Sequence, residues 1–179
     1  MSRGRIHRIP LRLLLALALG LGLAACGGDP DPEQAADDLA AMRSAVDSEL
    51  RDMAGALTAE GFAVERAVGR VEDEGMSTYR AQDYRASAVL VGEGDEATQV
   101  EAAAATLEGA GWTRKADGLD TGEANSWVQL ERDDFRTTIG WAKFGPRRLA
   151  LGLDQAGAVE VATDTPVVDR DNSEEIPLD

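Results

Sequence analysis

The sequence predicts an α+β domain, in which an antiparallel sheet of about five or six strands carries two helices on one face. Two observations predict this class. Apolar residues recur with helical spacing in two separate segments, and three consecutive segments in the second half alternate between apolar and polar residues. The expected order is helix, two strands, helix, a short strand at Trp112 and a three-stranded meander.

The first helix is expected to begin after Asp31, which can act as N-cap with Pro32 at the first helical position and Gln34 completing a capping box. Gly61 supplies its C-terminal stop. A coiled-coil stalk is the alternative, but only about three heptads are present, so packing on a sheet is favoured. The predicted buried stripe consists of Leu39, Met42, Val46, Leu50, Met53 and Leu57.

The next segments predict two strands and the second helix. In the first strand Phe62, Val64 and Val68 alternate with Glu65 and Ala67, and the strand should end at an acidic turn over residues 72–75. The second strand is expected from Tyr84 to Val91. Asp95 can cap the second helix, which Gly109 and Gly111 should end. The inward stripe of this helix is predicted to be Val100, Ala103, Ala104 and Leu107.

The meander has a register that the sequence itself specifies. A two-residue turn at Asp133-Asp134 pairs Arg132 with Phe135, and a three-residue loop over 144–146 pairs Lys143 with Arg147. Slipping either register by one residue would scramble the apolar face. That face is predicted to contain Val128, Leu130, Ile139, Trp141, Leu149, Leu151 and Leu153.

The single domain is expected to span residues 32–154. Beyond it, acidic residues together with Pro166 and Pro177 dominate residues 155–179. We expect this segment to be a mostly disordered acidic tail, with at most a short edge strand at Ala158 to Ala162.

The N-terminus has the features of an export signal. Arg3, Arg5, Arg8 and Arg12 form a basic region without acidic residues, and 13 uninterrupted Leu, Ala and Gly residues follow. This apolar run is shorter than the roughly 20 residues that a transmembrane helix needs. It therefore indicates a signal peptide.

Leu23, Ala24 and Ala25 precede Cys26, the only cysteine of the chain. This stretch resembles the lipobox of bacterial lipoproteins, and the residue usage of the chain is similar to that of small actinobacterial lipoproteins. The resemblance implies a signal peptide over 1–25, cleavage before Cys26, a lipidated tether over 26–31 and acyl chains such as palmitate on Cys26. It also implies a protein held by lipid on the extracytoplasmic face of the cell membrane.

Charge and histidine content exclude several functions. Cleavage removes four arginines, so Lys and Arg fall from 18 to 14 while Asp and Glu stay at 33, which changes the net charge from −15 to −19. Such a charge disfavours nucleic acid as a partner. His7 leaves with the signal peptide, which removes histidine-based catalysis and the usual zinc sites. We therefore expect no cofactor and no metal.

The outer face of the meander is the candidate interaction face, with Trp127, Gln129, Arg136 and Thr138 on it. Small residues around Trp127 would leave a shallow floor for a flat ligand or another protein. The alternative is structural, because an aromatic side chain opposite a strand glycine covers the exposed backbone. Asp133-Asp134 is interpreted as a turn and not as a pair of catalytic carboxylates.

The function that the sequence favours is a lipid-anchored, non-catalytic binding module of the cell envelope. Its partner would be an envelope protein or a small ligand. A carboxylate-dependent envelope hydrolase and a passive structural lipoprotein are the alternatives.

Replacing Cys26 tests the anchor. Cys26→Ser should eliminate lipid labelling and release unprocessed or soluble protein, because the acyl chains have no other attachment point. Metabolic labelling with a fatty acid and membrane fractionation measure this, and continued labelling of the variant would contradict the assignment.

Overall fold

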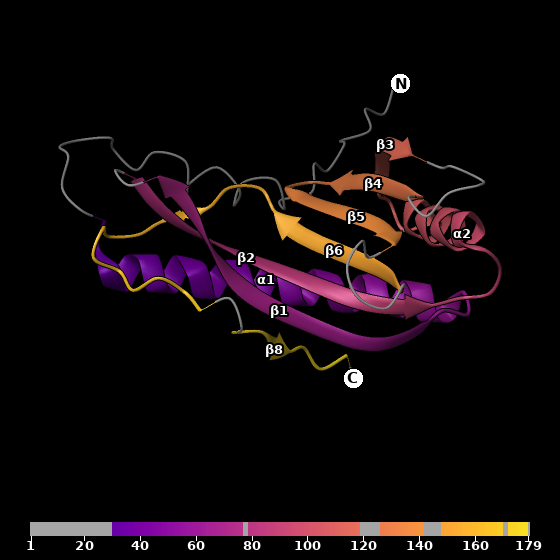
Figure 1. Cartoon of the computed structure of the whole chain (residues 1–179), viewed down its shortest axis with the longest axis horizontal. Coiled ribbons are helices and arrows are strands. Elements are labelled where there is room, and N and C mark those ends of the chain that lie inside the picture. The colour runs from indigo at the N-terminus through magenta and orange to yellow at the C-terminus, as the bar shows by residue number, and fades with distance from the viewer. Residues whose placement is uncertain (1–29, 77–78, 119–125, 142–147, 170–171, 179) are drawn as a thin grey trace, which may run out of the picture.

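The computed structural model describes residues 30–76, 79–118, 126–141, 148–169 and 172–178 (Figure 1). The signal peptide, the lipobox and Cys26 lie outside the described residues. Two helices and eight strands follow one another in the order α1 (Pro32–Ala59), β1 (Ala63–Met76), β2 (Tyr79–Val91), α2 (Glu96–Gly109), β3 (Thr113–Gly118), β4 (Trp127–Arg132), β5 (Phe135–Trp141), β6 (Leu149–Gln155), β7 (Val159–Glu160) and β8 (Glu174–Glu175).

One antiparallel sheet contains all the described strands, in the order β3-β4-β5-β6-β2-β1-β8. The short β7 pairs with the first part of β2, before the residues of β2 that pair with β6. The predicted α+β class with an antiparallel sheet is therefore confirmed. The sheet has eight strands, more than the expected five or six, because β7 and β8 come from the segment predicted to be a tail.

The ends of α1 follow from local hydrogen bonding. The Asp31 carboxylate accepts the Glu33 N–H at 3.0 Å, and Pro32 opens the helix as predicted. Gln34 does not complete a capping box; its amide instead donates to Asp38 one turn later, at 2.8 Å. Gly61 ends α1 with a φ of +93°, a conformation that glycine adopts without strain. Within the described ranges, no helix combines the length and hydropathy needed to cross a membrane.

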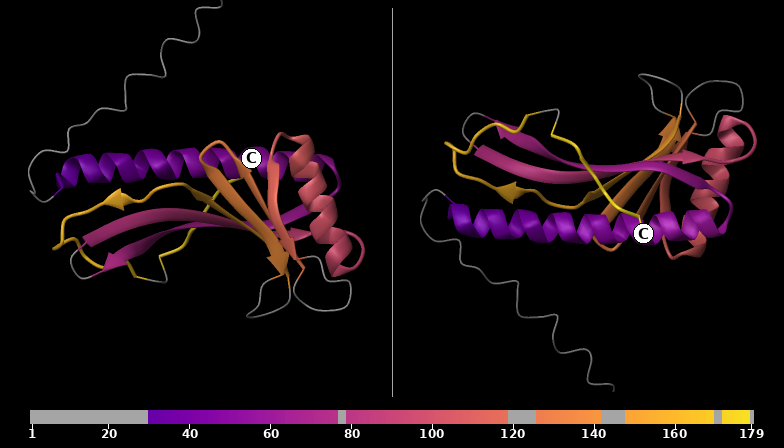
Figure 2. Two further views of the ribbon diagram at one scale, coloured as in Figure 1. Left: turned by 90° about the horizontal axis from the view of Figure 1, so that it is seen from above. Right: turned by 90° about the horizontal axis from the view of Figure 1, so that it is seen from below.

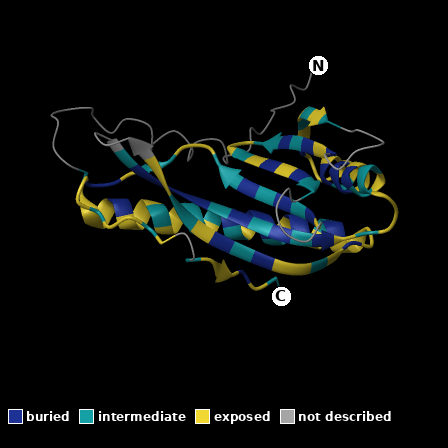
Figure 3. Cartoon of the chain, in the orientation of Figure 1, coloured by how far each residue is buried: buried dark blue, intermediate teal, exposed yellow. Residues whose placement is uncertain are grey.

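Both helices cover the same face of the sheet, here called the inner face (Figure 2). α1 runs along β2 and contacts β1, β6 and β7, whereas α2 lies over β3 to β6 at one end of the domain, where it also contacts α1. The coiled-coil alternative is thus not needed, since the stripe of α1 packs on the sheet. The central core residues include Val46, Leu50, Leu57, Leu107, Val128, Leu130, Ile139 and Leu151, and Figure 3 shows this alternation of buried and exposed positions along the strands.

The first hairpin is longer than predicted. The acidic stretch at 72–75 does not form a turn, because β1 continues through it to Met76 and pairs with β2 from Tyr79 onwards. Cross-strand partners explain why acidic residues stay in the strand. Asp73 accepts hydrogen bonds from Gln82 and Arg80 on one face, and Arg85 contacts acidic residues on the other.

A β-bulge in β1 changes which residues face the core. The register shifts between Val64, which pairs with Leu90, and Arg66, which pairs with Val89. The predicted alternation placed Val68 with Val64 and Ala67 on the other face. The bulge reverses this, so Ala67 is buried and Val68 lies on the outer face.

The meander register is confirmed. Trp127 pairs with Gly140 and Val128 with Ile139 between β4 and β5, and Ile139 pairs with Leu151 between β5 and β6. Asp133 in the turn has a φ of 51°, which a short polar residue tolerates. The expected pairing of Lys143 with Arg147 lies outside the described residues.

Residues 155–178 differ from the expected disordered tail where the structure describes them. β7 pairs with β2 within the segment expected to hold an edge strand, and β8 pairs with β1 at Val68 and Gly69. Ile176 is only 6% exposed and joins the core, while Arg51 of α1 donates to the Pro177 carbonyl at 2.9 Å. Burial of Val161, Ala162 and Ile176, together with strand pairing, offsets the ordering entropy that the acidic composition suggested would prevail.

Gly69 of β1 provides a test of the packing between sheet and α1. A Cβ at this position would lie 1.7 Å from the Tyr84 hydroxyl, which itself donates to Asp47 of α1 at 2.8 Å. Gly69→Ala should therefore displace Tyr84 and lower the free energy of unfolding by about 2–3 kcal/mol, from overpacking and a lost buried hydrogen bond. Urea denaturation measures the loss. Gly55→Ala is the matched control, because nothing lies near its Cβ in α1 and the free energy of unfolding should rise by up to about 1 kcal/mol.

Candidate functional site

The outer face of the sheet, opposite the helices, carries a row of charged side chains that crosses five strands. Strand pairing places Arg70 opposite Arg85, Arg85 opposite Asp154, Asp154 opposite Arg136 and Arg136 opposite Glu131. Residues directly opposite each other in antiparallel strands share a face and lie close together. The row therefore alternates in charge from β2 to β4.

The neighbouring row is made of small and polar residues. Ser87 of β2 pairs with Gly152 of β6, Gly152 pairs with Thr138 of β5, and Thr138 pairs with Gln129 of β4. Because these side chains are shorter than the arginines beside them, the face is hollowed along this row.

This depression has a volume of about 630 Å³ and is here called the arginine hollow. Four arginines from three strands lie around it, and Asp154 is the acidic residue in its lining. The lining residues are Arg66, Val68, Arg70, Arg85, Ala86, Ser87, Gln129, Arg136, Thr138, Gly152, Leu153, Asp154 and Ser173.

The bulge in β1 places Arg66 in the hollow. Without the register shift, Arg66 would share the inner face with Val64, two residues earlier. With the shift, Arg66 pairs with Val89 and joins the outer face. Bulges re-aim side chains in this way at sheet edges, at the rims of barrels and next to active sites.

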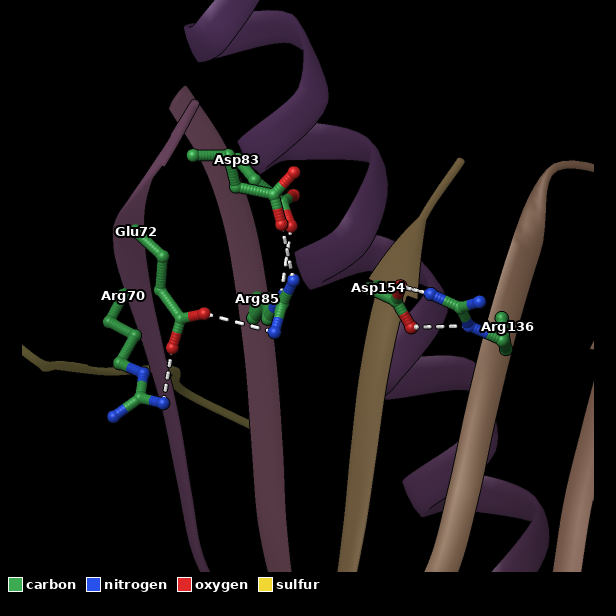
Figure 4. A network of polar contacts seen from close by, with 7 residues as sticks. Arg70, Glu72, Asp83, Arg85, Arg136 and Asp154 are labelled. Atoms are coloured by element: carbon green, nitrogen blue, oxygen red, sulfur yellow. Dashed lines mark hydrogen bonds and ion pairs between the residues drawn. The ribbon is translucent and has the colours of Figure 1, made fainter. Parts of the chain in front are cut away.

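Ion pairs hold the charged row in place (Figure 4). The Arg85 guanidinium lies 3.0 Å from Glu72, 2.6 Å from Glu74 and 2.9 Å from Asp83. Arg136 contacts both carboxylate oxygens of Asp154, the closer at 2.6 Å. Such a forked contact fixes the guanidinium plane, so the donors of Arg85 and Arg136 are pre-oriented.

Several donors that line the hollow have no acceptor in the described part of the chain. Arg66 has neither an ion pair nor a hydrogen bond there, and the hydroxyls of Ser87 and Thr138 and the amide of Gln129 are likewise without one. Unused donors from four strands therefore gather around one depression.

A second depression of about 420 Å³ adjoins the first and shares Arg85, Arg136 and Asp154 with it. We call it the acidic hollow. Six carboxylate side chains line it, from Glu74, Asp83, Glu131, Asp133, Asp134 and Asp154, together with Phe135, Gln155 and residues 156–158.

Asp83 is the most buried of these carboxylates, with 4% of the residue exposed. Its Oδ2 accepts from Arg85, whereas no donor in the described residues reaches its Oδ1. Burial raises the pKa of the Asp83 carboxyl, and the Arg85 hydrogen bond and charge oppose this shift. A carboxyl whose pKa is higher in the folded state than in the unfolded state stabilises the fold while it is protonated. This contribution is lost as the pH rises through the folded-state pKa, so ionisation of Asp83 lowers the free energy of unfolding.

The position of Asp83 follows from a break in the sheet. β6 pairs with β2 as far as Asp154 opposite Arg85, and β7 resumes the pairing with Val159 opposite Gln82. Residues 155–158 bridge this gap, with Gly157 at a φ of +95°. The carboxylate of Asp83 thus lies where β2 has no directly paired neighbour on that side.

The structure divides the residues predicted for the interaction face. Gln129, Arg136 and Thr138 line the arginine hollow together, whereas Trp127 does not. A Cβ on Gly118 would lie 2.3 Å from Trp127 Nε1, and one on Gly140 would lie 3.0 Å from Trp127 Cβ. Trp127 therefore covers strand glycines, which agrees with the structural alternative. The lipobox residues Leu23, Ala24, Ala25 and Cys26 lie outside the described residues.

Sequence reasoning missed Arg66, Arg70 and Arg85. The expected first strand ended before the acidic stretch could pair, and the bulge hid the face that Arg66 occupies. The one signal that could have found them is the opposite charge pattern of the two segments, with acidic residues at 72–74 and arginines at 80 and 85. That pattern favours cross-strand pairing.

The described residues contain no group of three or more His, Cys, Asp or Glu side chains arranged to hold a metal ion. No protein-family model matches the chain, and no curated protein or solved structure is significantly similar to it. The identification of the candidate site therefore depends on the geometry of this structure alone.

Truncating Trp127 tests its role. Trp127 is 38% exposed but covers Gly118 and Gly140, so Trp127→Ala should lower the free energy of unfolding by about 1–2 kcal/mol. Urea denaturation measures this, and Val167→Ala, at a side chain that is 77% exposed, should change it little. Unchanged stability together with lost ligand binding would instead assign Trp127 to a binding site.

Proposed function

We propose that this chain is a lipid-anchored, non-catalytic binding protein of the cell envelope, and that it captures ligands carrying an oxyanion group in the arginine hollow. The observation that carries the proposal is the gathering of unused donors around one depression on the uncovered face of the sheet. Arg66 is central, because the bulge turns it into the hollow and no described side chain neutralises it.

The chemistry of the hollow suits a carboxylate or phosphate group. An arginine presents its N–H groups in a planar fork that matches two oxygens of such an anion. Arg66 can provide this fork, and the hydroxyls of Ser87 and Thr138 can donate to remaining oxygens. Arg70 and Arg136 keep carboxylate partners in Glu72 and Asp154, and they add positive charge at the rim.

The overall charge of the chain opposes the approach of an anion. At −15 for the whole chain and −19 after the expected cleavage, long-range repulsion lowers the encounter rate. Affinity then depends on short-range contacts in the hollow. Such an arrangement favours small ligands whose charge the arginines can match, over extended polyanions such as nucleic acid.

Lipid attachment at Cys26 would keep the domain at the membrane surface. The expected tether over 26–31 leads directly into α1, whose first residue is Pro32. Two or more acyl chains hold a protein far more firmly than one.

An envelope hydrolase is the competing function, and the carboxylates around Arg85 bear on it. Glu74 and Asp83 both accept from the Arg85 guanidinium, at 2.6 and 2.9 Å. These contacts hold both carboxylates at one cation, whereas glycoside hydrolysis uses two carboxylates on opposite sides of a bond. This arrangement favours binding over hydrolysis.

Titration of the mature lipidated protein in detergent with citrate and with inorganic pyrophosphate tests the proposal. At least one of these oxyanions should bind, and Arg66→Gln should weaken its binding by about tenfold, because a charged hydrogen bond contributes about 1.5–3 kcal/mol. Isothermal titration calorimetry measures both affinities.

Arg114→Gln is the matched control, since Arg114 pairs with Glu101 and Glu108 outside the hollow and its loss should leave binding unchanged. Equal affinity for the wild type and the Arg66 variant would contradict the proposed site. Turnover of an envelope polymer by the wild type, abolished in Asp83→Asn, would contradict the non-catalytic assignment.

A further inference from the structure

In the described part of the chain, the arginine hollow contains hydrogen-bond donors without acceptors. In the acidic hollow the opposite holds, because oxygen acceptors are left without donors. Asp83 Oδ1 and Gln155 Oε1 are both buried and unpartnered among the described residues, and both side chains belong to the lining of this one depression. Buried polar atoms without partners are uncommon in folded proteins, so two in one site point to something that supplies donors.

The charge of the hollow defines that donor further. Its six carboxylates outnumber its two arginines, and the arginines are already engaged by Asp83, Glu74 and Asp154. The donor group that suits this site is therefore a cation. Figure 4 shows the Asp83 carboxylate beside Arg85. Strand pairing places Asp83 opposite the interruption between β6 and β7.

A metal ion is the less suitable cation. Calcium takes six to eight oxygen ligands in a close shell. The described residues hold no group of three acidic side chains close enough to form such a shell. A primary ammonium group needs fewer partners, because it has only three N–H donors on a compact charge and the two orphaned oxygens can accept two of them.

We infer that the acidic hollow binds a primary ammonium group, with Asp83 and Gln155 as its buried acceptors. The inference rests on the proposed binding function, since both hollows lie on one face and share the Arg85, Asp154 and Arg136 row. A ligand with an oxyanion at one end and an ammonium group at the other can span the two hollows. Zwitterions of the amino-acid class have this chemistry, and so do peptides with a lysine side chain.

The probe that isolates this site is 1,5-diaminopentane, which carries two ammonium groups and no anion. It should bind the mature protein and shift the backbone amide resonances of Asp83 and Gly157 in nuclear magnetic resonance spectra. The bis-trimethylammonium analogue has the same charge but no N–H donor. It should bind at least about tenfold more weakly if hydrogen bonding to buried acceptors drives recognition.

Two variants assign the acceptors. Asp83→Asn should weaken diaminopentane binding about tenfold or more, while Glu72 and Glu74 still hold Arg85. Gln155→Leu removes the other acceptor without changing charge and should also weaken binding, which keeps the inference testable if the Asp83 variant does not fold. Asp52→Asn, an exposed position on α1, changes the charge equally and should have no effect.

Three outcomes would overturn the inference. No diaminopentane binding to the wild type would mean that ordered water satisfies the two acceptors. Equal binding of the trimethylated analogue would reduce the site to diffuse charge attraction. Calcium that binds tightly and displaces the diamine would make the hollow a divalent-cation site. Oxyanion binding by Asp83→Asn separates the two proposals, because this variant should keep the citrate or pyrophosphate affinity that Arg66→Gln loses.

Separate titrations with N-acetyl-lysine amide and with free lysine distinguish the two possible sources of the ammonium group. Binding of the amide supports a lysine side chain of a peptide as the ligand. Tighter binding of free lysine, lost in both Asp83→Asn and Arg66→Gln, supports a zwitterion that spans both hollows.

Discussion

The hydrogen-bonding needs of β2 constrain the rest of this structure. β2 pairs with β1 along its whole length, but its other edge is longer than β6 can satisfy, so β7 completes it after an interruption. Backbone groups in a buried strand must be paired, which explains why the chain returns to β2 after leaving it. The interruption lies opposite Asp83 and Tyr84, and on the outer face it borders the acidic hollow. On the inner face Gly69 of β1 leaves the space in which Tyr84 reaches Asp47 of α1.

One face of the sheet forms the core, and the other carries the proposed binding site. The helices and the apolar stripes of β2, β4, β5 and β6 bury the inner face, so stability depends on packing there. The outer face has no covering layer among the described residues, and its charges are arranged by strand register. Arg85 and Asp154 lie opposite each other because the meander and the first hairpin are joined at β6 and β2. The arrangement of charges on this face is therefore a consequence of the sheet topology.

Local sequence patterns predicted the helices and strands. They did not predict features that depend on pairing between residues far apart in the chain. The meander register was predictable because a two-residue turn and an apolar face specify it together. The continuation of β1 through acidic residues depends on Arg85, which lies beyond the hairpin. The bulge before Arg66 likewise has no sequence pattern that marks it. Ile176 docks through contacts with residues more than a hundred positions earlier, and an acidic composition gave no indication of them. The same holds for the candidate site. The predicted meander register placed Gln129, Arg136 and Thr138 on its surface, whereas Arg66, Arg70 and Arg85 belong to the first hairpin, whose pairing was not predicted.

The docking of the C-terminal strand also has a kinetic consequence. The amide of Ile176 donates to the carbonyl of Ala67 at 3.0 Å, so the core closes only when residues more than a hundred positions apart in the chain meet. Contacts of such long sequence separation form late, because the entropy of closing a large loop must be overcome first. A nascent chain could not complete this core before Ile176 emerged. For the exported lipoprotein proposed above, this delay would keep the chain from closing prematurely on the side where it is made.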